Sequence, residues 1–136
     1  METLQIRTTE REELVDVTGA VRKLLHTNGW SDGAVLLYSP HTTSAVTINE
    51  GADPDVVRDI VVNLRRLIPL HGDYRHAEGN SDAHIKSSLF GCQKLVIVEG
   101  GELKLGTWQK IYFCEFDGPR TRKLWVQFLP GAGSRA

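Results

Sequence analysis

Near its C-terminal end the chain reads WQKIYFCEF at residues 108–116, DGP at 117–119 and RKLWVQFL at 122–129. The first and last of these stretches are rich in aromatic and β-branched residues, which is typical of strands. Asp, Gly and Pro between them are common turn residues, so we expect a tight hairpin there. Two long strands joined in this way indicate a sheet that is mostly antiparallel.

Working outward from this pair, four further segments are predicted to be strands. They are residues 3–8, 34–38, 43–49 and 94–98. The segment 34–38 is a continuous apolar run, which is typical of a strand buried on both faces, and 94–98 is also predicted to be a buried strand. The last residues, 130–136, are expected to form a frayed tail.

Three segments are predicted to be helices. The clearest begins at Asp53, which can accept bonds from the first-turn amides, and Pro54 suits its first position. An earlier helix follows Asp16 or Thr18 and ends at Gly29, and a short one covers residues 81–90. Because strands and helices do not alternate strictly, a doubly wound parallel sheet is disfavoured. We predict one α+β domain over residues 1–136, with a mostly antiparallel β-sheet or sandwich and helices packed on the outside.

Composition excludes some classes of protein. The formal net charge is −1, which gives no electrostatic basis for binding nucleic acid. No apolar run approaches the ~20 residues of a membrane span, and the N-terminus does not read as a signal peptide. We therefore expect a cytoplasmic protein with no membrane partner. Cys92 and Cys114 are expected to be free thiols in that reducing compartment.

Histidines are the first candidate functional group. His41, His76 and His84 each lie in a polar, turn-like stretch. Three neutral imidazoles with an open fourth position are a common arrangement for a catalytic zinc or a similar ion. Their spacing matches no compact metal motif, however, and scattered histidines are more often surface residues. His26 and His71 have the character of surface residues.

The predicted strand at 108–116 carries the second candidate group. Gln109 and Glu115 are an even number of residues apart, so in a regular strand they face the same side as Ile111 and Phe113. A carboxylate buried on that side needs a cation, a metal ion or a histidine as its partner. The alternative is that the other face is buried, which would leave Glu115 in water.

Two arginines follow the expected hairpin. The planar guanidinium groups of Arg120 and Arg122 match the geometry of phosphate oxygens, so the pair could clamp a phosphate. Solvated charges at an ordinary hairpin are the alternative.

Taken in order, these segments resemble the YjbQ family. The matching stretches are His41-Thr42-Thr43-Ser44, Asn49-Glu50, the segment with Tyr74 and His76, residues 79–88, Gly106-Thr107-Trp108-Gln109, and Glu115 with the arginines after it. The resemblance implies a secondary thiamine-phosphate synthase, which joins hydroxymethylpyrimidine pyrophosphate to thiazole phosphate. It also implies a compact sandwich-like fold, a homotrimer and a metal-associated histidine site near the subunit boundary.

On this hypothesis His41, His76 and His84 bind a divalent metal ion, zinc or magnesium. Glu115 acts as a base or orients a ligand, with His41 and His84 also catalytic. The small phosphorylated substrate is held by the remaining residues of the motifs, which are Lys86, Arg120, Arg122, Thr42, Thr43, Asn80, Gln109 and Trp108. Trp108 would stack on the pyrimidine ring.

Two alternatives use the same pocket. One is a trimeric module that binds a metal ion or an anion without turnover, and the other is a metal-dependent phosphoester hydrolase. For the trimer, we expect the apolar segments 95–98 and 125–128 to supply interface area.

Overall fold

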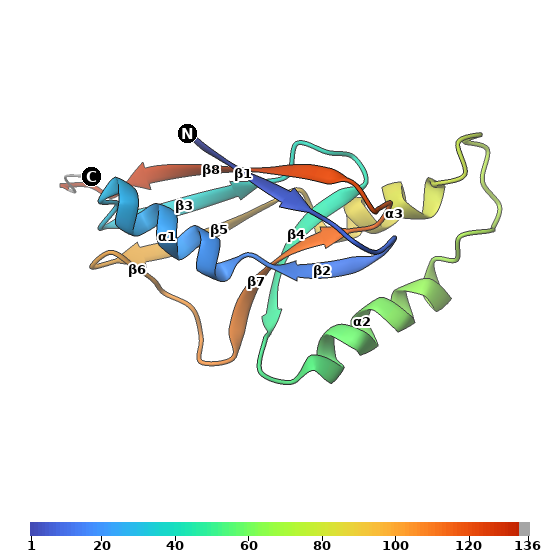
Figure 1. Ribbon diagram of the computed structural model, residues 1–136, viewed down its shortest axis with the longest axis horizontal. Helices are drawn as coiled ribbons and strands as arrows, with labels where there is room; N and C mark the ends of the chain where they lie inside the picture. Colours follow the sequence, from blue (N-terminus) through green and yellow to red (C-terminus); the bar gives the residue numbers. More distant parts are fainter. Residues whose placement is uncertain (134–136) are drawn as a thin grey trace.

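The computed structural model describes residues 1–133, in which two antiparallel sheets pack against each other with three helices around them (Figure 1). The five-stranded sheet has the order β1-β8-β3-β5-β6, and the three-stranded sheet has the order β2-β7-β4. The strands of the first sheet are β1 (Glu2–Arg7), β8 (Thr121–Pro130), β3 (Gly33–Tyr38), β5 (Gln93–Glu99) and β6 (Glu102–Leu103). Those of the second are β2 (Glu13–Asp16), β7 (Gln109–Glu115) and β4 (Ser44–Glu50). The predicted α+β class is confirmed.

The expected hairpin between the two C-terminal strands is wrong. β7 pairs with β2 and β4, whereas β8 pairs with β1 and β3, so the segment between them crosses from one sheet to the other. Turn residues suit such a crossing as well as a hairpin. Burial favours the crossing, because it lets Phe113 of β7 and Leu124 of β8 share one core between the two sheets.

The main core lies between the two sheets and is closed by α1 (Thr18–Asn28) through Val21 and Leu25. A smaller cluster on the opposite face of β7 joins Cys114 and Phe116 to Ala83 of α3 (Ser81–Phe90). The central strand β7 is therefore buried on both faces, and α3 packs beside its C-terminal end.

Local sequence signals placed the helices correctly. The backbone N–H of Thr18 donates to Asp16 Oδ1 at 2.9 Å, and α1 ends at Gly29, whose φ of +65° is favourable only for glycine. Asp53 caps α2 (Pro54–Leu67) by accepting a bond from the N–H of Asp55 at 2.9 Å. No helix within residues 1–133 is long and apolar enough to cross a membrane.

Other expectations need correction. β5 is buried on one face only: Leu95 and Ile97 are 60% and 63% exposed, while Val96 and Val98 face the core. β3, expected to be buried on both faces, buries Val35 and Leu37 but leaves Tyr38 on its other face 36% exposed. No layer within residues 1–133 covers the outer face of the five-stranded sheet, so its apolar residues stay open. The sequence also missed the short strands β2 and β6. Pro130 still belongs to β8, so the tail prediction is wrong there, and residues 134–136 lie outside the described part.

A buried ion cluster ties α3 to the segment before β2. The ammonium of Lys86 is fully buried and donates to Glu12 Oε2 and to Asp82 Oδ2, both at 2.9 Å. Arg11 adds two bonds to Asp82, and Arg65 of α2 adds one to Glu12. These contacts fix the orientation of α3 and anchor α2, a helix that has no fully buried residue of its own.

We expect Lys86→Ala to lower the free energy of unfolding by about 3–5 kcal/mol, because it leaves two carboxylates buried without their cation. Urea denaturation would measure the loss. Lys104→Ala is the matched control, since its ammonium is exposed and only 3.8 Å from Glu99, and should change stability by less than about 0.5 kcal/mol. Equal stability of the two variants would contradict the role of the cluster.

Candidate functional site

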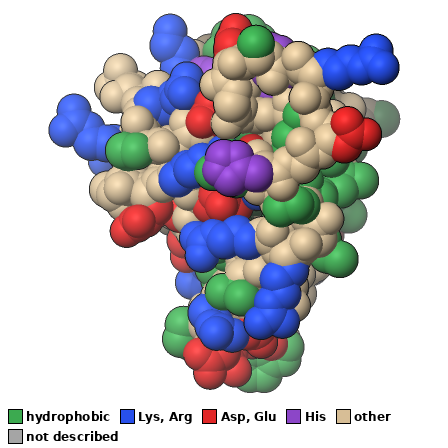
Figure 2. All heavy atoms as spheres, turned by 90° about the vertical axis from the view of Figure 1, so that its right-hand side faces the viewer, with side chains coloured by type: hydrophobic (Ala, Val, Ile, Leu, Met, Phe, Trp, Pro, Cys, Tyr) green, Lys and Arg blue, Asp and Glu red, His purple; other side chains and the backbone are tan. Residues whose placement is uncertain are grey.

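His41 and His84 mark a cleft at the end of the molecule that carries α3. A cavity of about 390 Å³ opens between them. Its lining includes His41, Thr42, Thr43, Asn80, His84, Asp117, Arg120 and Arg122. A second cavity of about 510 Å³ shares His41, Thr42 and His84 and continues to Ser44, Ser87 and Cys92. Figure 2 views this end of the molecule, where histidine, basic and acidic side chains gather on one surface.

The ring of His41 is held by the backbone of β8. Its Nε2 accepts the N–H of Lys123 at 2.9 Å, so the neutral imidazole carries its proton on Nδ1. Burial lowers the pKa of His41, and the nearby charge of Arg122 lowers it further. At neutral pH His41 is therefore an uncharged ring that can donate from Nδ1 and has no free acceptor nitrogen.

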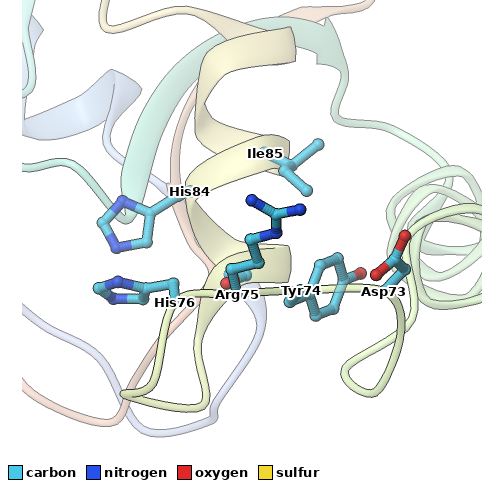
Figure 3. Close-up of a pocket in the computed structure, with 7 residues that line it drawn as sticks. Asp73, Tyr74, Arg75, His76, His84 and Ile85 are labelled. Carbon is cyan, nitrogen blue, oxygen red and sulfur yellow. The ribbon is translucent and has the colours of Figure 1, made fainter.

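The structure places His84 and His76 close together, two of the three histidines that the sequence singles out. His84 projects from the first turn of α3 and His76 from the preceding loop, and their ring centroids lie 5.3 Å apart with the planes at 81° (Figure 3). With Tyr74, Arg75 and Ile85 they line a further hollow of about 360 Å³. His84 thus borders three neighbouring cavities and is the one imidazole common to all of them.

The expected three-histidine metal site does not fit this arrangement. Within residues 1–133 no group of three or more His, Cys, Asp or Glu side chains is placed to hold a metal ion. His41 has a second obstacle: its Nε2 is engaged by Lys123, and metal binding through Nδ1 would require the tautomer that breaks this bond. A resident metal ion stays a prediction.

Glu115 and Arg122 form a buried pair behind the cleft. Arg122 Nε lies 2.9 and 3.1 Å from the two carboxylate oxygens, and Nη2 also donates to Glu115. Thr8 Oγ1 donates to Glu115 Oε1 at 2.7 Å. Burial alone would raise the pKa of Glu115, but the bonds from Arg122 and Thr8 outweigh it and lower the pKa. Of the two alternatives that the sequence left open, the structure shows the buried one, and the partner of Glu115 is a cation.

This geometry changes how the two residues act. Both oxygens of Glu115 are occupied, and Glu115 does not line the cavity, so it is placed to hold Arg122 rather than to take a proton from a ligand. Arg122 also donates to Thr43 Oγ1 at 2.8 Å. The pair therefore positions the loop that carries His41, Thr42 and Thr43.

Arg120 is the accessible cation of the cleft. Its side chain is 51% exposed and is oriented by Asp117, with Nε on the carbonyl oxygen at 2.9 Å and Nη2 on Oδ2 at 3.1 Å. Asn80 donates to the same carboxylate oxygen at 2.8 Å. Asp117 thus orients two predicted substrate-binding residues. The sequence showed it only as a turn residue.

Other predicted site residues lie elsewhere in the chain. Lys86 is neutralised in the buried cluster and does not line a cavity of the cleft. Gln109 is at the opposite end of β7 from Glu115, about 20 Å along the strand, where it accepts the N–H of Gly106. Trp108 precedes it and is 63% exposed. Within one chain the last two do not meet the histidines.

The fold and the cleft together describe a small α+β protein, with two antiparallel sheets and a site of histidine and arginine side chains at one end. The model of the "UPF0047 protein YjbQ-like" family matches residues 2–131, and the chain belongs to this family.

Its relatives cover nearly the whole chain. UPF0047 protein YugU of Bacillus subtilis is 51% identical over 130 residues, which are 95% of this chain and 98% of that protein. UPF0047 protein MJ1081 of Methanocaldococcus jannaschii is 50% identical, over 92% and 91% of the two chains. A crystal structure of an uncharacterised YjbQ/UPF0047 protein from Clostridium acetobutylicum has a TM-score of 0.93 at 51% identity, covering 95% and 100%. A conserved hypothetical protein from Thermus thermophilus has a TM-score of 0.89 at 43% identity, covering 95% and 100%.

The ion pair should make stability depend on pH. The pKa of Glu115 is lowered by folding, so its contribution is present above the unfolded-state value of about 4.3 and is lost as pH falls through the folded value. We expect Glu115→Gln to cost about 3–5 kcal/mol at pH 7 and much less under acid conditions. Urea denaturation between pH 7 and pH 3 measures this. A penalty that does not shrink at low pH would contradict the assignment.

Proposed function

We propose that the chain is an enzyme that binds a phosphorylated substrate in the cleft and transfers its organic group as the phosphate or pyrophosphate leaves. One observation carries this proposal: Arg120, His41 and His84 line the same cavity of about 390 Å³. An exposed guanidinium and an imidazole N–H are donors suited to phosphate oxygens. Two carboxylates, Glu78 and Asp117, also line this cavity. Asp117 accepts bonds from Arg120 and Asn80, and Glu115 behind the cavity is paired with Arg122.

The specific reaction we propose is thiamine-phosphate synthesis. The ring nitrogen of thiazole phosphate attacks the methylene carbon of hydroxymethylpyrimidine pyrophosphate. A C–N bond forms, the C–O bond breaks, and pyrophosphate leaves with the electron pair. Catalysis of such a step depends on stabilising the charge on the departing oxygens and on excluding water.

Each cleft residue then has a role. Arg120 stabilises the developing negative charge, and its orientation by Asp117 reduces the freedom it loses on binding. His41 donates from Nδ1, since its lowered pKa and its bond from Lys123 make it a donor at neutral pH and not a base. His84, at the junction of the cavities, is the group we propose to exchange a proton with the leaving pyrophosphate.

The direct test is an assay of untagged protein with both half-substrates, following thiamine phosphate and pyrophosphate. We expect Arg120→Ala to lower kcat/KM by about ten- to a hundred-fold, and Arg120→Lys to recover part of the loss. Arg58→Ala is the control, because that arginine is exposed on α2 and pairs only with Asp59. Normal turnover in Arg120→Ala would remove it from the mechanism.

The same assay separates the alternatives. Binding of both half-substrates without product would indicate a binding module, and phosphate release from single phosphoesters would indicate a hydrolase. Elemental analysis and a chelator arm test the divalent ion: a stoichiometric metal and loss of activity with chelator would restore the metal hypothesis. We place the reaction in the cytoplasm, where the unpaired Cys92 and Cys114 stay reduced.

We further propose that three copies assemble through the outer face of the five-stranded sheet. Leu95 and Ile97 of β5 and Leu129 of β8 are exposed there, whereas Val96, Val98 and the alternate residues of β8 are used by the core. Light scattering at micromolar concentration should give the mass of three chains. Ile97→Glu should weaken assembly, because it buries a charge at an apolar contact. A monomeric parent protein would contradict the proposal.

A further inference from the structure

An aromatic pair lies on the outer sheet face at the end nearest the cleft. Tyr38 of β3 and Trp125 of β8 are cross-strand partners, and their rings stack with centroids 5.8 Å apart and planes at 12°. Both side chains are partly open, at 36% exposed. Large aromatic rings left open in this way are suited to binding another flat ring, because stacking adds to the area they bury.

A groove connects this pair to the candidate site. A cavity of about 400 Å³ has Tyr38 and Trp125 on its lining together with Pro40, His41, Thr42 and Cys92. His41 and Thr42 also line the cavity that holds Arg120. The groove is therefore aromatic on one side and polar where it meets the cleft. Its volume lies within the range of small-molecule sites.

The strand that carries Trp125 also supplies a cation and a fixed link to the cleft. Lys123 is two residues before Trp125 and exposed, so alternation places both side chains on the same sheet face. The backbone N–H of Lys123 holds His41. A ligand that spans the groove would thus meet an aromatic surface, then positive charge and an imidazole donor.

We propose that the groove binds the heteroaromatic ring of a phosphorylated substrate, with the ring against Trp125 and Tyr38 and the phosphate toward His41 and Arg120. The position of the phosphate rests on the function proposed above, and the ring site rests on the aromatic pair. Trp125 then takes the stacking role that the sequence suggested for Trp108, which lies near the opposite end of β7 from the cleft. Hydroxyl-bearing phosphates without a ring would use only the polar half.

Calorimetric titration with three probes tests this. The probes are hydroxymethylpyrimidine phosphate, which has ring and phosphate, glycerol 3-phosphate, which has no ring, and hydroxymethylpyrimidine, which has no phosphate. We expect Trp125→Leu to weaken both ring-containing probes about tenfold or more and to leave glycerol 3-phosphate unchanged. Trp125→Phe should retain most of the affinity. Arg120→Ala should weaken both phosphate-containing probes and spare the third.

Trp108→Leu is the discriminating control. If it weakens the ring probes while Trp125→Leu and Tyr38→Leu bind them like the parent protein, the inference is overturned and the original assignment to Trp108 stands. If Trp125→Leu weakens only the ring-containing probes but the parent protein forms no thiamine phosphate, the synthase proposal is refuted and the ring site is supported. Normal synthesis in both Trp125→Leu and Tyr38→Leu, with unchanged affinities, would refute the groove alone.

Fluorescence keeps the test decisive if Trp125→Leu disturbs assembly. The chain has three tryptophans, and Trp30 packs against Phe128. In a Trp108→Phe background, hydroxymethylpyrimidine should still quench the emission. Quenching should disappear in Trp108→Phe/Trp125→Phe. Absence of quenching in the first variant, at concentrations that saturate the parent protein, would overturn the inference.

Discussion

The buried pair of Glu115 and Arg122 is the interaction on which the fold and the cleft both depend. Glu115 ends β7 in one sheet and Arg122 begins β8 in the other, so their bonds join the two sheets where the chain crosses between them. Removing two charges from water is costly, and the cost is offset only when the partners and their remaining hydrogen bonds are complete. Thr8 and Thr43 complete them, which brings β1 and the loop of His41 to the same point. A substitution of any of these residues is therefore expected to alter both the packing of the core and the position of the cleft loop.

The cations near the cleft differ in how far they are buried. Arg122 is neutralised by Glu115, and Lys86 by Glu12 and Asp82, so neither brings an uncompensated charge to a ligand. Arg120 is paired with Asp117, but its side chain is 51% exposed and lines the cavity. The buried cations Arg122 and Lys86 therefore stabilise the fold, whereas the exposed Arg120 is accessible to a ligand. Which cation can contact a ligand depends on its burial and pairing. The number of basic residues in the sequence does not show this.

Local signals in the sequence were sufficient for the helices and most strands, because caps such as Asp53 and stops such as Gly29 act within a few residues. Pairing between strands was not predictable in the same way. The turn at 117–119 is compatible with a hairpin or a crossing, and only contacts between distant residues select one. The same limit applies to the site. Motif order grouped Trp108 with Glu115, although the intervening strand separates them by about 23 Å. The sequence proposed one group of His41, His76 and His84, and the structure places the rings of His76 and His84 beside each other.

The outer face of the five-stranded sheet leaves apolar side chains exposed in the described part of the chain. All three helices contact strands of the three-stranded sheet, and nothing in the described part covers the other face of β3, β5 and β8 (Figure 1). In β5, apolar residues on this face alternate with apolar core residues. One face of the strand is therefore exposed and the other buried, although both are apolar. The cross-strand register divides this face into rows. Ala34, Ile97 and Leu129 form a row at one end, and Tyr38 and Trp125 lie at the end that adjoins His41. Association of copies over the first row would leave the second facing the cleft, so one sheet face can serve assembly and ligand binding at once.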